Sequence, residues 1–326
     1  MAAQRSKTTG NIDNTGFGTN SNAEGGRLTN KDGSINLQRT GIPFFQRISL
    51  YHTLLRMPRL KFLLCVFLFY TVLNIFFATI YIIIGVENLQ GVHAENEFTS
   101  FQAAFFFSSQ TLTTVGYGHI SPVNLWANII ASLESFIGIL SFAVVTGLLY
   151  GRFTRPKAYM RFSQNVLIAP HKGIHALMAR VATYKNTHLT DVDAQVTLAM
   201  HIHENGKRIT RFFPLELEIK KINSLALNWT IVHLINEDSP LYQMTLRDIQ
   251  EADIELIYHL KGFDDHFSNV VQQRTSYTFN ELVYGARFLP MYHRSEDGST
   301  TVLSLDKINA HEPAPLPELG KSAYNA

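Results

Sequence analysis

The chain has 326 residues, a formal net charge of +2 at pH 7 and a hydrophobic fraction of 46%. So small a positive charge excludes the strongly basic surface typical of proteins that bind nucleic acid. The mean hydropathy of +0.01 is too low for a chain that lies wholly in a membrane, so we expect a short membrane unit joined to soluble parts.

Residues 1–40 are expected to be a disordered tail, because Asn, Gly, Thr and Ser dominate and large apolar residues are almost absent. The next segment, 41–58, is predicted to be an amphipathic helix, in which apolar residues recur at helical spacing. These residues are Phe44, Ile48, Tyr51 and Leu55. A basic helix just before a membrane span is expected to lie flat on the inner leaflet; packing on a soluble domain is the alternative.

Two membrane-spanning helices are predicted within a pore unit of residues 59–151. Phe62–Ile84 contains no charged residue, and at about 1.5 Å per residue it can cross a hydrocarbon core of about 30 Å. Leu125–Tyr150 contains one charge, Glu134. Between these spans, Thr99–Thr111 is apolar and aromatic but too short to cross, which is typical of a re-entrant pore helix.

A filter sequence follows the predicted pore helix. Thr-Val-Gly-Tyr-Gly is known from potassium channels, in which four chains replace the hydration shell of K⁺ with backbone carbonyl oxygens. Glycine permits the backbone conformations that this requires, and Thr114 adds a hydroxyl oxygen. The predicted filter is Thr114, Val115, Gly116, Tyr117 and Gly118, with K⁺ at the first four. Because such backbone must be covered by protein or line a cavity, we expect an assembly.

The distribution of charge predicts the orientation. Lys and Arg residues precede the first span and follow the second, whereas the segment 85–125 between the spans has Glu87, Glu95 and Glu97 but no Lys or Arg. The positive-inside rule therefore predicts that both termini are cytoplasmic, and no signal peptide is expected. The acidic residues would favour cations on the outer side.

Seven basic residues near the predicted inner leaflet are expected to bind anionic lipids; the alternative is that they only set the topology. They are Arg47, Arg56, Arg59, Lys61, Arg152, Arg155 and Lys157.

The second span suggests a gate. Gly138, Phe142, Thr146 and Tyr150 recur at intervals of four, so they are predicted to face the conduction path with Glu134. Four Tyr150 rings could close the pore by dewetting; the alternative is an interfacial anchor. Glu134 either raises the occupancy of cations or accepts hydrogen bonds from the pore helix. Gly138 is a candidate bending point or a site of close helix packing.

Residues 166–310, which follow a linker over 152–165, are predicted to form an antiparallel, immunoglobulin-like β-sandwich. Asp253–Leu260 alternates strictly, with Ile254 and Leu256 on the apolar face and Glu255 on the polar face. Similar runs occur at Ile174–Tyr184, Gln195–His203, Thr230–Ile235 and Thr275–Val283. A proline-rich tail over 311–326 is expected to be disordered. The predicted fold class is thus a two-span α-helical pore domain plus an all-β cytoplasmic sandwich, an α+β multidomain protein.

Several separate segments resemble inward-rectifier potassium channels of the bacterial type. They are 50–55 with Pro58-Arg59 (the interfacial slide helix), 74–78 (the outer helix), 134–138 and 155–157 (the inner helix and linker), and 162–163, 238–241 and 285–288 (the cytoplasmic domain). The resemblance implies a homotetramer whose cytoplasmic domains extend the pore, a constriction at Tyr150 and control by lipids. Phe142 stands where strong rectifiers have an acidic residue, so block by intracellular cations is expected to be weak. Gln110 replaces a glutamate of eukaryotic members, and the absence of their extracellular cysteine pair favours the bacterial branch.

Other functions lack residues to perform them. The sequence has no arginine-rich voltage-sensing helix, nucleophile elbow or phosphate-binding glycine loop, so neither an enzyme nor a cofactor other than permeant K⁺ is expected. His201 and His203 are either a metal-binding pair or solvent-facing strand residues. The predicted function is passive K⁺ conduction across the plasma or inner membrane. A membrane-anchored sensor with a non-conducting pore is the alternative, and an intact Tyr117 argues against a nonselective cation channel.

Overall fold

A computed structural model describes residues 27–38, 40–41, 43, 49–93, 95–204 and 207–317. The chain divides into two compact units. One comprises Thr40–Arg155, and the other comprises Met1–Arg39 together with Pro156–Ala326. Each unit has its own hydrophobic core.

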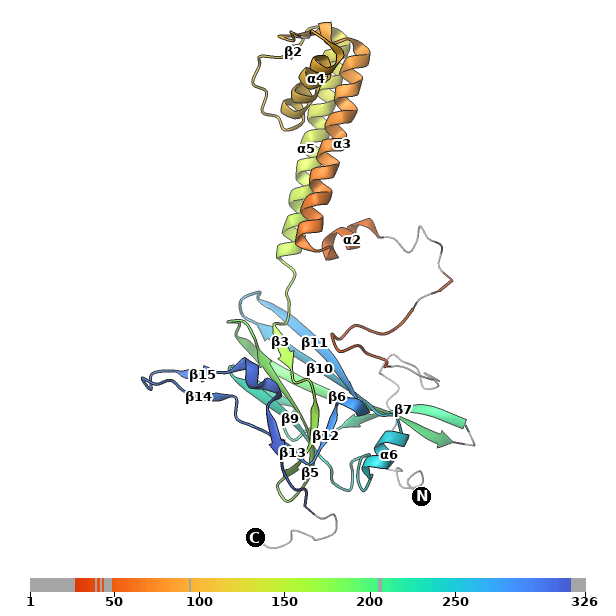
Figure 1. Cartoon of the computed structure of the whole chain (residues 1–326), viewed down its shortest axis with the longest axis vertical. Helices are drawn as coiled ribbons and strands as arrows, with labels where there is room; N and C mark the ends of the chain where they lie inside the picture. The colour runs from red at the N-terminus through yellow and green to blue at the C-terminus, as the bar shows by residue number, and fades with distance from the viewer. Residues whose placement is uncertain are drawn as a thin grey trace. The chain divides into compact units, whose positions relative to one another are not determined.

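The unit Thr40–Arg155 is helical. Its helices are α2 (Leu50–Arg56), α3 (Arg59–Ile84), α4 (Glu97–Leu112) and α5 (Leu125–Phe153). Figure 1 shows the long helices α3 and α5 side by side, with the shorter α4 packed against them at one end and α2 at the other. Both long helices have the length and apolar composition to cross a membrane, which confirms the predicted two-span unit.

Local sequence signals explain where these helices begin. Pro58 precedes α3, and proline is tolerated there because the first amides of a helix have no intrahelical acceptor. Asn96 caps α4 by accepting a hydrogen bond from the amide of Thr99. Asn124 caps α5 in the same way through the amide of Ala127. The re-entrant segment, which is α4 and the loop after it, therefore begins after Asn96 and ends at Asn124.

The core of the helical unit lies where α3, α4 and α5 meet. Ala78, Ala104 and Ala127 contribute one small side chain from each helix, and all three are buried. Small residues let helix backbones approach closely in a membrane. The ring of Tyr81 packs edge-on against Phe107, with 5.0 Å between the ring centroids. The helix α4 is thus packed against both membrane-spanning helices.

The second unit is a β-sandwich of two five-stranded sheets. One sheet contains β3 (Met160–Phe162), β4 (Val166–His171), β5 (Ile174–Thr183), β9 (Asn228–Leu234) and β12 (Leu282–Tyr284). The other contains β6 (Leu189–Glu204), β7 (Lys207–Leu215), β8 (Lys221–Ser224), β10 (Glu255–Asp264) and β11 (Asn269–Thr278). The short helix α6 (Leu246–Glu251) precedes β10. The prediction of a wholly antiparallel sandwich is wrong at one pair, because β12 runs parallel to β4.

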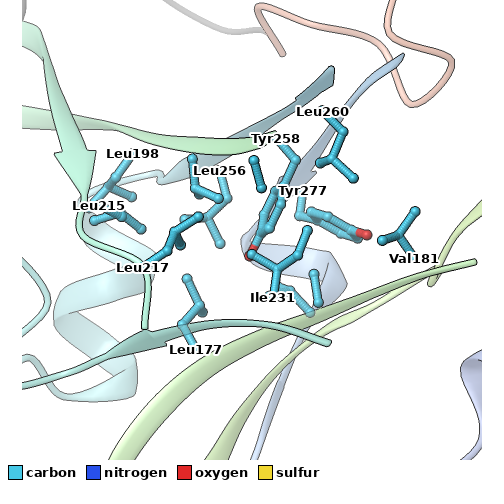
Figure 2. Close-up of a cluster of buried hydrophobic side chains, with 14 of the residues drawn as sticks. Leu177, Val181, Leu198, Leu215, Leu217, Ile231, Leu256, Tyr258, Leu260 and Tyr277 are labelled. Carbon is cyan, nitrogen blue, oxygen red and sulfur yellow. The ribbon is translucent and has the colours of Figure 1, made fainter. Parts of the chain in front are cut away.

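The inner faces of the two sheets form one core, part of which Figure 2 shows. Leu177 and Ile231 from one sheet face Leu256 and Tyr258 from the other. The alternation in β10 buries its apolar residues as predicted. The hydroxyl of the buried Tyr277 donates to the carbonyl of Ser163 at 2.8 Å, so its polar end is satisfied within the core.

The expected disorder of residues 1–40 is wrong for the described part from Arg27 onward. The amides of Leu28 and Thr29 donate to the carboxylate of Glu255 at 2.6 and 2.9 Å. Arg27 forms an ion pair with Glu281 at 2.5 Å. Glu255, which the alternation placed on a solvent face, is therefore buried beneath a segment far away in sequence. Residues 1–26 lie outside the described residues.

The predicted C-terminal tail also begins too early. Residues His311–Pro313 form β16, which pairs with β13 (Ala286–Phe288) in an antiparallel ladder. A hairpin of β14 (Tyr292–Arg294) and β15 (Thr301–Leu303) lies between them in the chain. Proline is compatible with the end of a short edge strand, so the proline-rich composition alone misled the prediction. Residues 318–326 lie outside the described residues. The strand β3 likewise falls within the predicted linker 152–165.

The buried His233 predicts a pH dependence of stability. Its ring nitrogens lie 2.6 Å from the carbonyl of Glu216 and 2.8 Å from the hydroxyl of Ser239. Burial lowers the pKa of His233 below its ordinary value of 6.5, so the unfolded chain takes up a proton first as the pH falls. The stability from neutral His233 is therefore present above about pH 6.5 and decreases below it.

We expect the unfolding temperature of the full protein in detergent to decrease between about pH 7.5 and about pH 5.5, and His233→Gln to weaken that decrease. His293→Gln, at an exposed position in β14, is the control and should keep the original pH profile. An unchanged pH profile in His233→Gln would contradict the assignment.

Candidate functional site

The loop after α4 contains the predicted filter residues, and its first amides return to the end of that helix. The amide of Thr114 donates to the carbonyl of Thr111 at 3.0 Å. The amide of Val115 donates to the carbonyl of Gln110 at 2.9 Å, and that of Gly116 is 3.4 Å from the same oxygen. Carbonyls that α4 leaves unpaired at its end thus hold the start of the loop.

The backbone of this loop alternates in handedness. Thr114, Gly116 and Gly118 have φ values of 60°, 54° and 84°, whereas Val115 and Tyr117 between them are not in the left-handed region. Such alternation turns successive peptide units so that their carbonyls face the same side of the strand. Glycine adopts positive φ at little cost, but β-branched Thr114 is strained there. The sequence analysis identified the two glycines but missed the left-handed conformation of Thr114. The spacing of two residues between Thr114, Gly116 and Gly118 was the signal that could have indicated it.

A small two-stranded sheet positions the end of the loop that follows Gly118. β1 (Leu89–Gln90) pairs with β2 (Ser121–Pro122), which joins the chain before α4 to the chain after the loop. Gly91 has φ of 90°, and a Cβ there would lie 1.8 Å from the carbonyl oxygen of His119. Glycine is therefore required at this close approach.

Glu134 of α5 is buried inside the protomer and joins α5 to α3 and α4. Its carboxylate accepts hydrogen bonds from Tyr81 of α3 at 2.7 Å and from Ser108 of α4 at 2.5 Å. All three side chains are buried. The prediction that Glu134 lines the pore is therefore wrong. The alternative, that it accepts hydrogen bonds from the pore helix, is confirmed by the hydrogen bond from Ser108 of α4.

Removing this carboxylate is expected to destabilise the protein. In Glu134→Ala the hydroxyl of Tyr81 would stay buried without its acceptor, at a cost of about 1–3 kcal/mol, and the hydroxyl of Ser108 would keep only the side-chain oxygen of Asn74, at 3.2 Å. The unfolding temperature in detergent should decrease clearly, and less so in Glu134→Gln, whose carbonyl oxygen still accepts. Glu95→Ala, at an exposed position, is the control. Equal unfolding temperatures for Glu134→Ala and Glu95→Ala would contradict this role.

Gly138 is also buried rather than exposed on the predicted stripe. A Cβ at this position would lie 2.0 Å from the carbonyl oxygen of Leu112, the last residue of α4. Of the two interpretations of this glycine, close packing is therefore the one that the contact supports. The remaining stripe residues, Phe142, Thr146 and Tyr150, are exposed in the protomer. Phe142 also lines, with Leu112 and Thr114, a mainly apolar cavity of about 460 Å³.

The predicted lipid-binding residues separate into different groups. Arg56, Arg59, Lys61 and Arg155 are exposed in the helical unit, and Lys157 is exposed in the other unit. Arg152 instead donates to the carbonyls of Leu54 and Met57 and stacks on the ring of Phe62. It thereby satisfies the carboxyl end of α2. Arg47 lies outside the described residues.

The histidine pair in β6 gains no metal-binding partners. Among the described residues, no group of three or more His, Cys, Asp or Glu side chains is placed to hold a metal ion. His201 lies 3.9 Å from the carboxylate of Asp253, and His203 is exposed.

Two apolar helices that flank a re-entrant helix and a loop of alternating handedness define an ion channel, here with a β-sandwich domain. The comparisons with known families agree. A model described as "Ion channel" matches residues 66–155, and the "Inward rectifier potassium channel C-terminal domain" model matches residues 160–325. The chain belongs to the inward-rectifier potassium channel family, as the sequence resemblance predicted.

Individual relatives support this assignment. The chain is 32% identical over 294 residues to the inward rectifier potassium channel Kirbac3.1 of Paramagnetospirillum magnetotacticum, covering 88% of this chain and 96% of the relative. Similarity to the ATP-sensitive inward rectifier potassium channel 12 of Gallus gallus is 30% identity over 202 residues, 59% of this chain and 47% of that protein. Inward rectifier potassium channel 18 of Homo sapiens is 29% identical over 202 residues, 59% and 46% of the two chains.

Proposed function

We propose that the protein is a potassium-selective channel that conducts K⁺ passively through residues 114–118. The alternating handedness of Thr114, Gly116 and Gly118 carries this proposal, because it aligns backbone carbonyls as an ion-coordinating strand needs. K⁺ would bind at Thr114, Val115, Gly116 and Tyr117. Membership of a channel family implies transport rather than enzymatic catalysis, and the proposal needs no cofactor beyond the permeant ion.

The functional form is proposed to be a homotetramer. In the single protomer the filter loop is exposed, with Tyr117 showing 76% of its surface. Non-helical backbone at membrane depth requires protein around it or a water-filled path beside it. Three further copies around a fourfold axis would supply both, and would bring four sets of carbonyls toward one ion.

Gating is proposed at the inner helix and in the cytoplasmic domain. Tyr150 and Phe142 are exposed on α5, so four copies of each could approach the axis and exclude water. Neither is acidic, so intracellular blocking cations would bind weakly. The exposed basic residues Arg56, Arg59, Lys61 and Arg155 would bind anionic lipids, each contributing about 1 kcal/mol. Both termini would lie in the cytoplasm of a cell whose plasma or inner membrane holds the channel.

Uptake of rubidium into liposomes tests the conduction. Purified protein would be reconstituted with K⁺ inside, in neutral lipid and in lipid mixtures of increasing anionic content. We expect barium to block rubidium uptake, and a sodium gradient not to support uptake in place of the K⁺ gradient. We also expect uptake to change with the anionic lipid content. An absence of uptake in every mixture would contradict conduction and favour a non-conducting sensor. Uptake that sodium supports equally would contradict potassium selectivity.

A further inference from the structure

One buried cation in the β-sandwich unit is not used by the proposed channel mechanism. Arg180 lies on β5 and is only 4% exposed. Its neighbours on the same face, Met178 and Ala182, belong to two apolar clusters outside the main core. The carbon of its guanidinium lies 4.4 Å from the ring centroid of Phe288 in β13. The charge is therefore enclosed between apolar groups.

Two of the three guanidinium nitrogens of Arg180 lack acceptors among the described residues. Its Nε and Nη1 atoms are buried and have no hydrogen-bond partner there, and no described carboxylate forms an ion pair with it. The side-chain oxygen of Asn228 in the adjacent strand β9 is likewise buried without a partner. Arg180 pairs with Thr230, and Ala182 pairs with Asn228. Arg180 and Asn228 are therefore diagonal neighbours on one face of the sheet.

An unpaired buried guanidinium is costly. Burial lowers the pKa of Arg180 to about 10, which still leaves the group charged at neutral pH. A buried ion without a counter-ion is strongly destabilising, and its attraction to the face of an aromatic ring offsets only part of this cost. A water molecule could satisfy the hydrogen bonds, but it would not neutralise the charge. The arrangement therefore calls for an anion.

We propose that Arg180 and Asn228 form a binding site for a small phosphate anion. Arg180 would supply the positive charge and the donors at Nε and Nη1. The oxygen of Asn228 needs a donor, and the P–OH group of a monoprotonated phosphate provides one, whereas sulfate and chloride do not. The anion would connect β5 and β9 to the covering strand β13. The site lies within one unit and does not rest on potassium conduction.

Thermal unfolding of the full-length protein in lipid-free detergent tests the site, with chloride, sulfate and phosphate buffers at equal ionic strength. The wild-type unfolding temperature is expected to increase with phosphate concentration and less with sulfate. A parallel arm with short-chain phosphatidic acid distinguishes a free anion from a lipid headgroup. A wild type that shows no shift in phosphate, an equal shift in sulfate, or a shift only with phosphatidic acid would overturn the proposal.

Variants assign the effect to these residues. Arg180→Met should lose the phosphate shift and should be at least as stable as the wild type in chloride, because an apolar side chain replaces an unpaired charge. Arg180→Lys and Asn228→Ala should each weaken phosphate affinity by about tenfold, and they keep the test valid if Arg180→Met does not fold. Arg247→Met, at a side chain that is 86% exposed, is the control and should keep the full shift. An undiminished shift in Arg180→Lys and Asn228→Ala would overturn the site.

Discussion

Gly138→Ala is expected to abolish rubidium uptake and to lower the unfolding temperature of the channel. The new Cβ would lie 2.0 Å from the carbonyl oxygen and 2.9 Å from the carbonyl carbon of Leu112. Backbone atoms cannot rotate away as the end of a side chain can, so α5 or the end of α4 must move. Leu112 lies between Gln110, whose carbonyl holds the loop, and Thr114, so the displacement reaches the proposed filter.

A second glycine of the same helix provides the matched control. A Cβ at Gly147 would meet no atom within 4 Å in the protomer. Gly147→Ala should therefore keep uptake, with a gain in helix propensity of up to about 1 kcal/mol. Uptake and unfolding temperature would be measured for both variants in the same lipid mixture. Normal uptake by Gly138→Ala, or equal losses in both variants, would contradict the close-packing role.

Gly116→Ala is expected to reduce rubidium uptake by at least about tenfold, which corresponds to about 1.4 kcal/mol. A steric clash is not the cause, because no atom of the protomer lies within 4 Å of where a Cβ at Gly116 would be. The cause is the backbone conformation. At φ of 54° an alanine costs about 1–2 kcal/mol in each copy, which favours rotation of a peptide unit away from the ion path. The variant should still fold, since the contacts between the helices are unchanged.

Gly298→Ala tests whether strain alone explains that loss. Gly298 has φ of 70° and lies in the hairpin between β14 and β15. The same substitution there introduces comparable strain away from the filter, so uptake should be retained. The measurement is barium-sensitive uptake per unit of reconstituted protein. Full uptake by Gly116→Ala would contradict the role of its left-handed conformation.

The helical unit could be predicted in outline because its strongest signals are local. The uncharged run from Phe62 to Ile84 can only be placed in an apolar environment, and its length then fixes the span. The alternation in β10 predicted which side chains enter the core of the sandwich, because period two is a property of the strand itself. The family assignment also followed from short segments, and the comparisons confirmed it.

The errors concern partners that are remote in sequence. The predicted stripe assigned Glu134 and Gly138 to the conduction path by their spacing from Tyr150. Spacing gives the relative direction of side chains on one helix, but not which neighbour that direction meets. Ser108, Tyr81 and the carbonyl of Leu112 enclose these positions, and all three belong to other helices.

The sequence by itself determined the two spans, the sandwich and the family, because each depends on composition, periodicity or short local segments. Only the tertiary structure decided the side-chain roles. Glu255 is buried because the segment from Arg27 folds over it. Arg152 of α5 caps α2, although α3 and α4 lie between these two helices in the sequence. Arg180 is enclosed without a counter-ion among the described residues for the same reason. Burial and pairing depend on residues that packing brings together, and no local pattern encodes them.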